Sequence, residues 1–419
     1  MNNFTLPFCR SEQLLGDFII ATYRISGLTF ESIMEKVGKF AVGQSIGTWV
    51  QVPGVSPSMV ENYQARVISL VSSSEEISDF PMTFLIRIAF PSANFGKSMT
   101  MLMTALVGND VSTALQVKLL DLEFVGSAIK DFSSPKKGIK EIRALAHVEE
   151  QRPLLLNMIK PCAGFSPEEG ANLFLQVALG GVDLIKDDEL LGSPSYNLVA
   201  QRTKLYLAAA DRAYEVTGKR TVYMPNISGT PSQVMDNAKA ILDCGAKACL
   251  VNYVFGGLDM LRELTDAYGD DLFVMGHYAG VASFDHPNSG ISNPVFIGLL
   301  PRLCGASAMM TMFPNRKDSG ALFNFYRTIQ YQQLPIPTVR PLVPTVGGGI
   351  TPINQVFIQD TIGKDTIIGI GGAIQGHPMG TEIGAKTAMA AIEATAKGIS
   401  LQEASVGNPG LQVALEIWN

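Results

Sequence analysis

Short apolar runs rich in β-branched residues alternate with longer stretches of helical periodicity from residue 154 onward. This alternation is typical of βα units around a parallel sheet, and eight units can close into a (β/α)8 TIM barrel. We count eight runs, at 154–161, 182–189, 221–228, 248–254, 272–278, 307–313, 338–346 and 366–372. Helices are expected between them, for example at 167–179, 199–217, 231–244 and 380–397. The fold class predicted from this pattern is α/β.

The residues before the barrel follow another pattern, in which strand-like segments outnumber helical ones. Strands are expected at 18–25, 65–72, 82–90 and 117–124, and helices at 29–41 and 97–107. We therefore expect a smaller α+β, ferredoxin-like domain over residues 1–137 and the barrel domain over 138–419, joined by a connecting helix. The polar stretch at 133–138 marks the boundary.

Composition excludes several classes of protein. The apolar stretches are interrupted by Arg, Pro, Lys or Asp before the ~18 residues that a membrane span needs. A net charge of -6 without a basic run argues against a nucleic-acid partner. The five cysteines are odd in number and scattered, and no signal peptide is apparent, which favours reduced thiols in the cytoplasm. An enzyme acting on a small molecule is the simplest expectation.

Polar side chains follow the second barrel strand, in the segment Lys186-Asp187-Asp188-Glu189. Strand alternation places Lys186 and Asp188 on one face and Asp187 on the other. Because active sites of such barrels lie at the carboxyl ends of the strands, these groups mark a candidate site, and their oxygen donors suit Mg²⁺. A structural ion pair without metal explains the same residues equally well.

Other strand ends add a lysine, a histidine and glycines to this rim. Lys160 follows the first strand, and we expect burial and a neighbouring ammonium group to lower its pKa and make it a proton shuttle. His277 ends the fifth strand, either as an acid/base group or as a wall residue. The glycines after strands seven and eight predict a phosphate site, because their backbone N–H groups can approach an anion. These glycines are Gly348, Gly349, Gly371 and Gly372.

The motifs together resemble the ribulose-bisphosphate carboxylase (RuBisCO) large-subunit superfamily. They are GGVDLIKDDE at 180–189, Ile159-Lys160-Pro161, Gly47-Thr48-Trp49 and Gly376-His377-Pro378. The resemblance implies that CO2 forms a carbamate on Lys186 and that this carbamate binds Mg²⁺ with Asp188 and Glu189. It also implies a homodimer with shared active sites, or a larger oligomer, in which one subunit's N-terminal domain completes its partner's site.

The resemblance assigns further roles residue by residue. Lys160 matches the acid/base lysine and His277 the rim histidine. Asn109 matches the asparagine that the partner subunit offers to substrate and metal. Thr48 and Trp49 match residues that help to hold the phosphate, and the glycine pairs match those that cradle it.

Several positions depart from a true carboxylase. Cys162 replaces a second lysine and Gly43 replaces a glutamate, so two catalytic groups are lost. Tyr278 and Met310 replace an arginine and a histidine that hold the second phosphate. Lys317 falls only at the spacing of the mobile-loop lysine, within a different local sequence.

This pattern is that of a RuBisCO-like protein without bisphosphate carboxylase activity. We expect Mg²⁺-dependent enolate chemistry, by isomerisation or decarboxylation, on a singly phosphorylated keto sugar or keto-sugar acid such as oxo-isoapionate phosphate. The alternatives are the 2,3-diketo-5-methylthiopentyl-1-phosphate enolase or the methylthioribulose-phosphate isomerase of methionine salvage. A non-catalytic binding or regulatory protein is the alternative of another class, although unused buried charges would cost stability.

Overall fold

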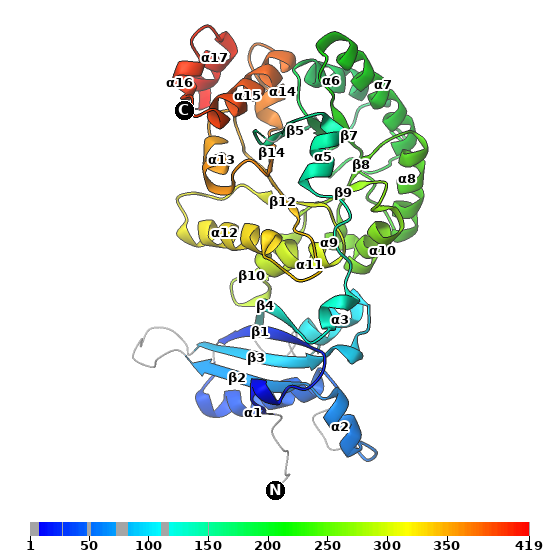
Figure 1. Ribbon diagram of the computed structural model, residues 1–419, viewed down its shortest axis with the longest axis vertical. Coiled ribbons are helices and arrows are strands. Elements are labelled where there is room, and N and C mark those ends of the chain that lie inside the picture. The colour runs from blue at the N-terminus through cyan, green and yellow to red at the C-terminus, as the bar shows by residue number, and fades with distance from the viewer. Residues whose placement is uncertain are drawn as a thin grey trace. The chain divides into compact units, whose positions relative to one another are not determined.

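The computed structural model describes residues 8–26, 28–47, 52–72, 83–109, 117–149 and 151–418 (Figure 1). Contacts divide the chain into two units. The N-terminal unit comprises Met1–Phe132 and Gly280–Phe296, and the barrel unit comprises Ser133–Ala279 and Ile297–Asn419. In the part of the chain that the structure describes, no helix combines the length and the apolar character needed to cross a membrane.

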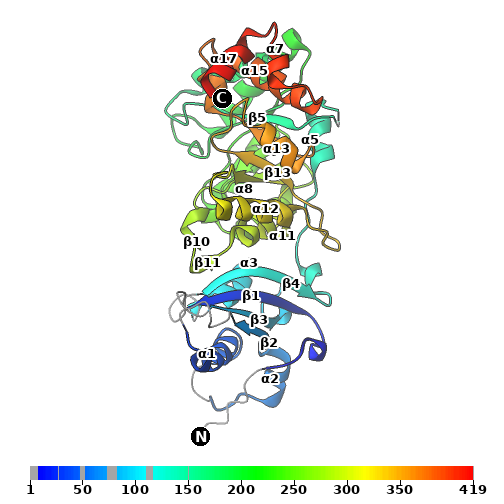
Figure 2. The same ribbon diagram turned by 90° about the vertical axis from the view of Figure 1, so that its left-hand side faces the viewer.

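The N-terminal unit is built on an antiparallel sheet in the order β4-β1-β3-β2. Its elements along the chain are β1 (Phe18–Ser26), α1 (Phe30–Gly43), α2 (Pro57–Tyr63), β2 (Arg66–Ser72), β3 (Thr83–Pro91), α3 (Met99–Val107) and β4 (Val117–Val125). Short 3-10 turns lie at Ser11–Gln13, Ser92–Asn94 and Ala128–Asp131. Both views show α1 against one face of this sheet (Figures 1 and 2). The strand order and the helical crossovers are those of a ferredoxin-like domain, as predicted.

Tyr23 of β1 joins the two longer helices of this unit. Its ring meets the ring of Phe40 in α1 edge to face at 5.1 Å, and its hydroxyl donates to the carbonyl of Leu106 in α3 at 2.8 Å. Tyr23 and Phe40 are almost completely buried. A buried tyrosine needs such a partner, because an unpaired hydroxyl in an apolar core is costly.

A hairpin from the middle of the barrel sequence belongs to the N-terminal unit. Strands β10 (Asp285–His286) and β11 (Ser289–Ile291) extend the sheet beyond β4, with Gly290 paired to Lys118. Lys118 also forms an ion pair with Asp285. This hairpin could not be predicted from the sequence, because its strands are too short to show an apolar run.

The barrel unit confirms the predicted (β/α)8 architecture. Its eight parallel strands are ordered β7-β6-β5-β14-β13-β12-β9-β8, and an Asn226–Leu250 bridge between the ends of this order closes the sheet. The strands are β5 (Leu154–Met158), β6 (Leu184–Lys186), β7 (Val222–Met224), β8 (Ala248–Val251), β9 (Phe273–Gly276), β12 (Ala308–Met312), β13 (Val343–Gly347) and β14 (Ile367–Gly369).

Strand alternation divides the barrel core in two. Leu154 and Leu156 of β5 belong to a cluster shared with inward residues of the other strands, whereas Leu155 packs with the surrounding helices. Ile142 and Ala146 of the helix that precedes the first barrel strand belong to the same inner cluster.

Helices follow the strands around the barrel. The unit contains α5 (Ile139–Ala146), α6 (Pro167–Leu179), α7 (Val199–Thr217), α8 (Pro231–Asp243), α9 (Tyr253–Gly256), α10 (Leu258–Tyr268), α11 (Leu300–Leu303), α12 (Ser319–Gln333), α13 (Val356–Ile362), α14 (Gly372–Gln375), α15 (Thr381–Ala396), α16 (Leu401–Ala404) and α17 (Pro409–Trp418). A π-helical turn at Pro294–Leu299 precedes α11. Ser166 and Glu169 form a capping box that fixes the start of α6 at the predicted residue, Pro167.

Candidate active site

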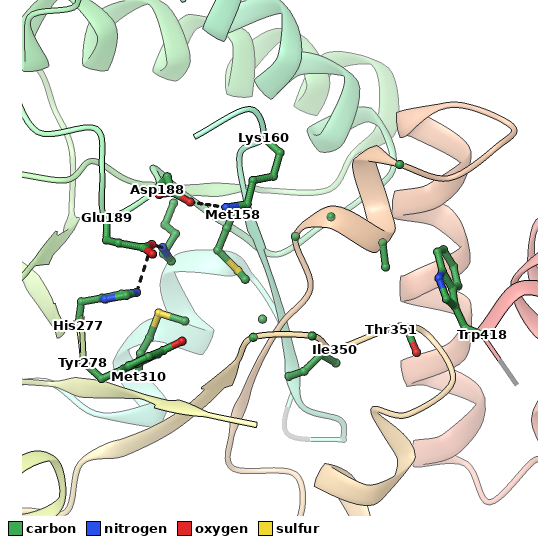
Figure 3. Close-up of a pocket in the computed structure, with 18 residues that line it drawn as sticks. Met158, Lys160, Asp188, Glu189, His277, Tyr278, Met310, Ile350, Thr351 and Trp418 are labelled. Carbon is green, nitrogen blue, oxygen red and sulfur yellow. Dashed lines mark hydrogen bonds and ion pairs between the residues drawn. The ribbon is translucent and has the colours of Figure 1, made fainter. Parts of the chain in front are cut away.

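A cavity of about 530 Å³ opens at the carboxyl ends of the barrel strands (Figure 3). Nine of the residues predicted for the site line it, namely Lys160, Lys186, Asp188, Glu189, His277, Gly348, Gly349, Gly371 and Gly372. They come from the ends of β5, β6, β9, β13 and β14, which are far apart in the sequence. Closure of the barrel brings them together.

At the end of β6, the adjacent carboxylates of Asp187 and Asp188 point to opposite sides of the barrel wall. Asp188 lines the cavity, whereas Asp187 points away from it and is completely buried. Asp187 accepts hydrogen bonds from Arg202 Nε at 2.9 Å, from the Tyr223 hydroxyl at 2.8 Å and from the Asn226 backbone N–H at 2.8 Å. This buried network fixes the strand end from which Asp188 and Glu189 emerge.

Lys160 and Asp188 form the shortest polar contact drawn in the cavity, at 2.5 Å between Nζ and Oδ2 (Figure 3). Lys160 Nζ also donates to Cys162 Sγ at 3.1 Å. Burial is the largest single influence on Lys160 and opposes its charge, but the hydrogen bonds and charges of Asp188 and Cys162 together outweigh burial and raise the pKa of Lys160. The expectation of a lowered pKa was wrong, because it did not include this ion pair across 28 residues of sequence.

Lys186 is the completely buried cation of the cavity. Its Nζ lies 3.7 Å from Glu189 Oε2 and donates to the Asp187 carbonyl at 3.0 Å. Burial lowers the pKa of Lys186, against the opposing attraction of Glu189 and Asp188. The amine of Lys186 therefore loses its proton more readily than that of an exposed lysine.

His277 faces Glu189 as a neutral imidazole. Its Nδ1 accepts the Ala279 backbone N–H at 3.1 Å, so the ring proton lies on Nε2, 3.4 Å from Glu189 Oε2. Burial, assisted by the nearby charge of Lys186, lowers the pKa of His277 to about 3. His277 therefore acts as a hydrogen-bond donor rather than as a cation near neutral pH.

The wall beside His277 is apolar and aromatic. Tyr278 stacks on His277 with ring centroids 4.8 Å apart, and burial raises the pKa of the Tyr278 hydroxyl. Met310 and Met158 line the same part of the cavity (Figure 3). The two departures noted in the sequence, Tyr278 and Met310, thus both lie at the cavity surface, and neither side chain is a cation.

Glycines form the opposite part of the cavity. A side chain built on Gly349 or Gly372 would meet nothing within 4 Å, so open space lies above both. Gly348 and Gly349 adopt φ of 90° and 71°, which L side chains rarely tolerate. Gly371 and Gly372 begin α14, whose first N–H groups have no intrahelical acceptor. These glycines can therefore bring backbone donors close to an anion.

Four residues singled out in the sequence are not among the described residues that line the cavity. Thr48 and Trp49 lie outside the described residues. Asn109 belongs to the N-terminal unit, and its predicted role stays a prediction. Lys317 is exposed and does not line the cavity as the structure describes it.

Several residues that line the cavity were not predicted from the sequence. Met158 points inward from β5, and Ile350, Thr351 and Trp418 also line the cavity. Strand alternation could have identified Met158, since it shares a face with Leu154 and Leu156. No local signal places Trp418, because only the packing of α17 brings it there.

Comparisons with known proteins agree with this architecture. The sequence model of the ribulose bisphosphate carboxylase large chain catalytic domain matches residues 138–418, and that of its N-terminal domain matches residues 13–126. A ribulose bisphosphate carboxylase-like protein of Archaeoglobus fulgidus is 36% identical over 393 residues, covering 91% of this chain and 88% of that protein.

Two further relatives have more specific names. The 2,3-diketo-5-methylthiopentyl-1-phosphate enolase of Geobacillus kaustophilus is 32% identical over 417 residues, covering 96% of this chain and 98% of that protein. The dimeric archaeal RuBisCO of Hyperthermus butylicus is 29% identical, with a TM-score of 0.87 and coverage of 99% of both chains. The chain belongs to the ribulose bisphosphate carboxylase large-chain family and is a RuBisCO-like protein.

Proposed function

We propose that the protein enolises a singly phosphorylated ketone with the help of Mg²⁺, and that 2,3-diketo-5-methylthiopentyl 1-phosphate is its substrate. From the sequence alone, this salvage reaction ranks second, behind enolate chemistry on a singly phosphorylated keto sugar or keto-sugar acid. The relative from Geobacillus kaustophilus that carries the enolase name supports the salvage reaction. The order of the two hypotheses is therefore reversed.

The distribution of charge in the cavity is the observation that carries this proposal. Among the described lining residues the cations are Lys160 and Lys186, and both lie beside carboxylates. The glycines can receive one phosphate, whereas Tyr278 and Met310 offer no charge to a second. A substrate with one phosphate and an apolar methylthio end fits both parts of the cavity.

The residues also fit a magnesium ion. Within the described part of the chain, no three His, Cys, Asp or Glu side chains are grouped as a metal site. Asp188 and Glu189 supply carboxylate oxygens, and a carbamate on Lys186 would provide a third donor. When bound there, Mg²⁺ would polarise the substrate ketone and stabilise the negative charge of the enolate.

Lys160 is the proposed base. It takes the proton from the carbon beside the ketone as an amine and returns a proton as an ammonium group. Because its ion pair with Asp188 raises its pKa, Lys160 becomes a base only when Asp188 is engaged elsewhere. His277 Nε2 lies 3.4 Å from Glu189 Oε2, and its lowered pKa keeps the imidazole neutral near neutral pH.

The proposal includes a homodimer with shared sites in the cytoplasm. In it, the N-terminal domain of one subunit, which we propose spans residues 1–137, completes the barrel site of the other subunit. The residues that this domain contributes are Thr48, Trp49 and Asn109. The dimeric state of the Hyperthermus butylicus relative supports this arrangement. Dimerisation in solution would be measured by sedimentation.

Solvent deuterium exchange followed by NMR tests the function. The panel contains 2,3-diketo-5-methylthiopentyl 1-phosphate, methylthioribulose phosphate, oxo-isoapionate phosphate and ribulose bisphosphate, each with Mg²⁺ and bicarbonate. We expect enolisation of the diketone and no carboxylation of the bisphosphate. Decarboxylation of the keto-sugar acid alone would restore the first hypothesis. No reaction, with no rise in Tm from Mg²⁺ and bicarbonate, would favour a non-catalytic binding protein.

A further inference from the structure

Helix α17 brings a residue to the cavity that no motif predicted. Its last residue, Trp418, lines the cavity together with Thr351, Gly371 and Gly372. In Figure 3 the indole lies near Thr351, on the side of the cavity away from His277 and Tyr278. Trp418 therefore bounds the part of the cavity in which the phosphate is proposed to bind.

His377 fixes the position of this helix. It is 3% exposed, and its Nδ1 accepts the Met379 backbone N–H at 3.2 Å. The ring proton therefore lies on Nε2, which donates to the Gly410 carbonyl in α17 at 3.1 Å. The same imidazole meets the Trp418 indole edge to face, with centroids 6.1 Å apart. One side chain thus contacts both the start and the end of α17.

Close packing on α15 holds α17 in place as well. A side chain added to Gly410 would come within 2.3 Å of Thr387 Oγ1, so the helices approach as closely as a glycine permits. Leu411 and Ala414 of α17 are completely buried against Ala391 of α15. The indole is consequently presented by a fixed element rather than by a loop.

We propose that Trp418 is a substrate-positioning residue that donates its indole N–H to the phosphoryl group, and that His377 acts through it. The indole nitrogen is a donor only. No hydrogen bond to a described residue uses it. This inference rests on the proposed function, because it takes the phosphate to bind at Gly371 and Gly372. It assigns a role to His377, which belongs to a family motif that the proposed reaction leaves unused.

Fluorine NMR tests the contact directly, with inorganic phosphate as the probe. The chain has two tryptophans, so the full-length protein labelled with 5-fluorotryptophan gives two resonances, and Trp418→Phe identifies one of them. We expect phosphate to shift the Trp418 resonance in a saturable way. Calorimetry measures the same binding without reference to tryptophan.

Variants test the hydrogen bond and its support. Trp418→Phe keeps an aromatic ring but loses the hydrogen-bond donor. We expect the affinity for phosphate to fall about tenfold. The KM for the substrate should rise by a similar factor, and kcat should change less. His377→Ala should cause a comparable loss of phosphate affinity. His377→Gln can still donate to the Gly410 carbonyl, so this variant should keep most of the affinity that His377→Ala loses. Rescue by glutamine distinguishes positioning from a general loss of stability.

The outcomes separate this inference from the proposed function. If calorimetry detects phosphate but the Trp418 resonance and the affinity of Trp418→Phe do not change, the role of Trp418 is wrong and the proposed function stands. If the wild-type protein binds no phosphate but enolises the unphosphorylated diketone equally well, the phosphate site and the role of Trp418 both fail.

Discussion

Asp187 and Asp188 are neighbours in the chain, yet their carboxylates lie on opposite sides of the barrel wall. Asp187 is paired with the completely buried Arg202 at 2.9 Å, and Asp188 with the cavity-facing Lys160 at 2.5 Å. The first pair lies in the packed layer behind the strands, and the second faces the proposed substrate. The rigidity of the first therefore determines where the second can lie.

The first prediction concerns the structural pair. Asp187→Asn leaves Arg202 buried without a counter-charge, and we expect the free energy of unfolding to fall by about 3–5 kcal/mol. Urea denaturation measures the change. Asp211→Asn is the matched control, because Asp211 pairs with Arg220 at the surface, and its cost should stay below about 1 kcal/mol. Equal losses in the two variants would contradict a structural role for Asp187.

The second prediction separates metal binding from proton transfer. Lys186→Ala removes the proposed carbamate, so Mg²⁺ with bicarbonate should no longer raise Tm, and turnover should disappear. Lys160→Ala should keep the rise in Tm but slow deuterium exchange by about 10²–10⁴-fold. Lys239→Ala, a surface lysine paired with Asp243, is the control and should change neither. Turnover by Lys186→Ala would refute the carbamate.

The barrel could be predicted because its signals are local. Each strand is a short apolar run, and Ser166 and Glu169 mark the start of α6 within four residues. The ends of the strands are less predictable. Residues 182–189 were expected as one strand, but β6 spans only Leu184–Lys186, because Asp188 turns to accept the Leu190 backbone N–H at 3.1 Å.

Long-range contacts could not be read from the sequence. Lys160 and Asp188 could each be predicted as site residues from their residue types and their positions at strand ends. Their ion pair, and its effect on the pKa of Lys160, could not, because the pair forms only when the barrel closes. The hairpin β10–β11 joins the sheet through Gly290 and Lys118, which are 172 positions apart by their numbers. Trp418 reaches the cavity only through packing on α15.

The third prediction addresses the lost carboxylase groups. Tyr278→Arg restores one cation at the cavity wall, yet it leaves Cys162 and Gly43 in place of catalytic groups. Since such groups act as a set, we expect no CO2 fixation above background with ribulose bisphosphate. Incorporation of labelled CO2 measures this. The double variant Tyr278→Arg, Met310→His should also remain inactive, and fixation by either would contradict our account of the departures.

The fourth prediction concerns thiol reactivity and pH. Burial raises the pKa of Cys249 to about 12 and also raises that of Cys304. A raised pKa keeps a thiol protonated, so neither group should react with DTNB as the pH rises from 7 to 9 in the folded protein. Cys162 and Cys244 are partly exposed and serve as internal controls that react first. All five cysteines should react in urea. Peptide mass mapping identifies which cysteines are labelled without denaturant. Rapid labelling of Cys249 or Cys304 under those conditions would show that the barrel core opens far more readily than its packing implies.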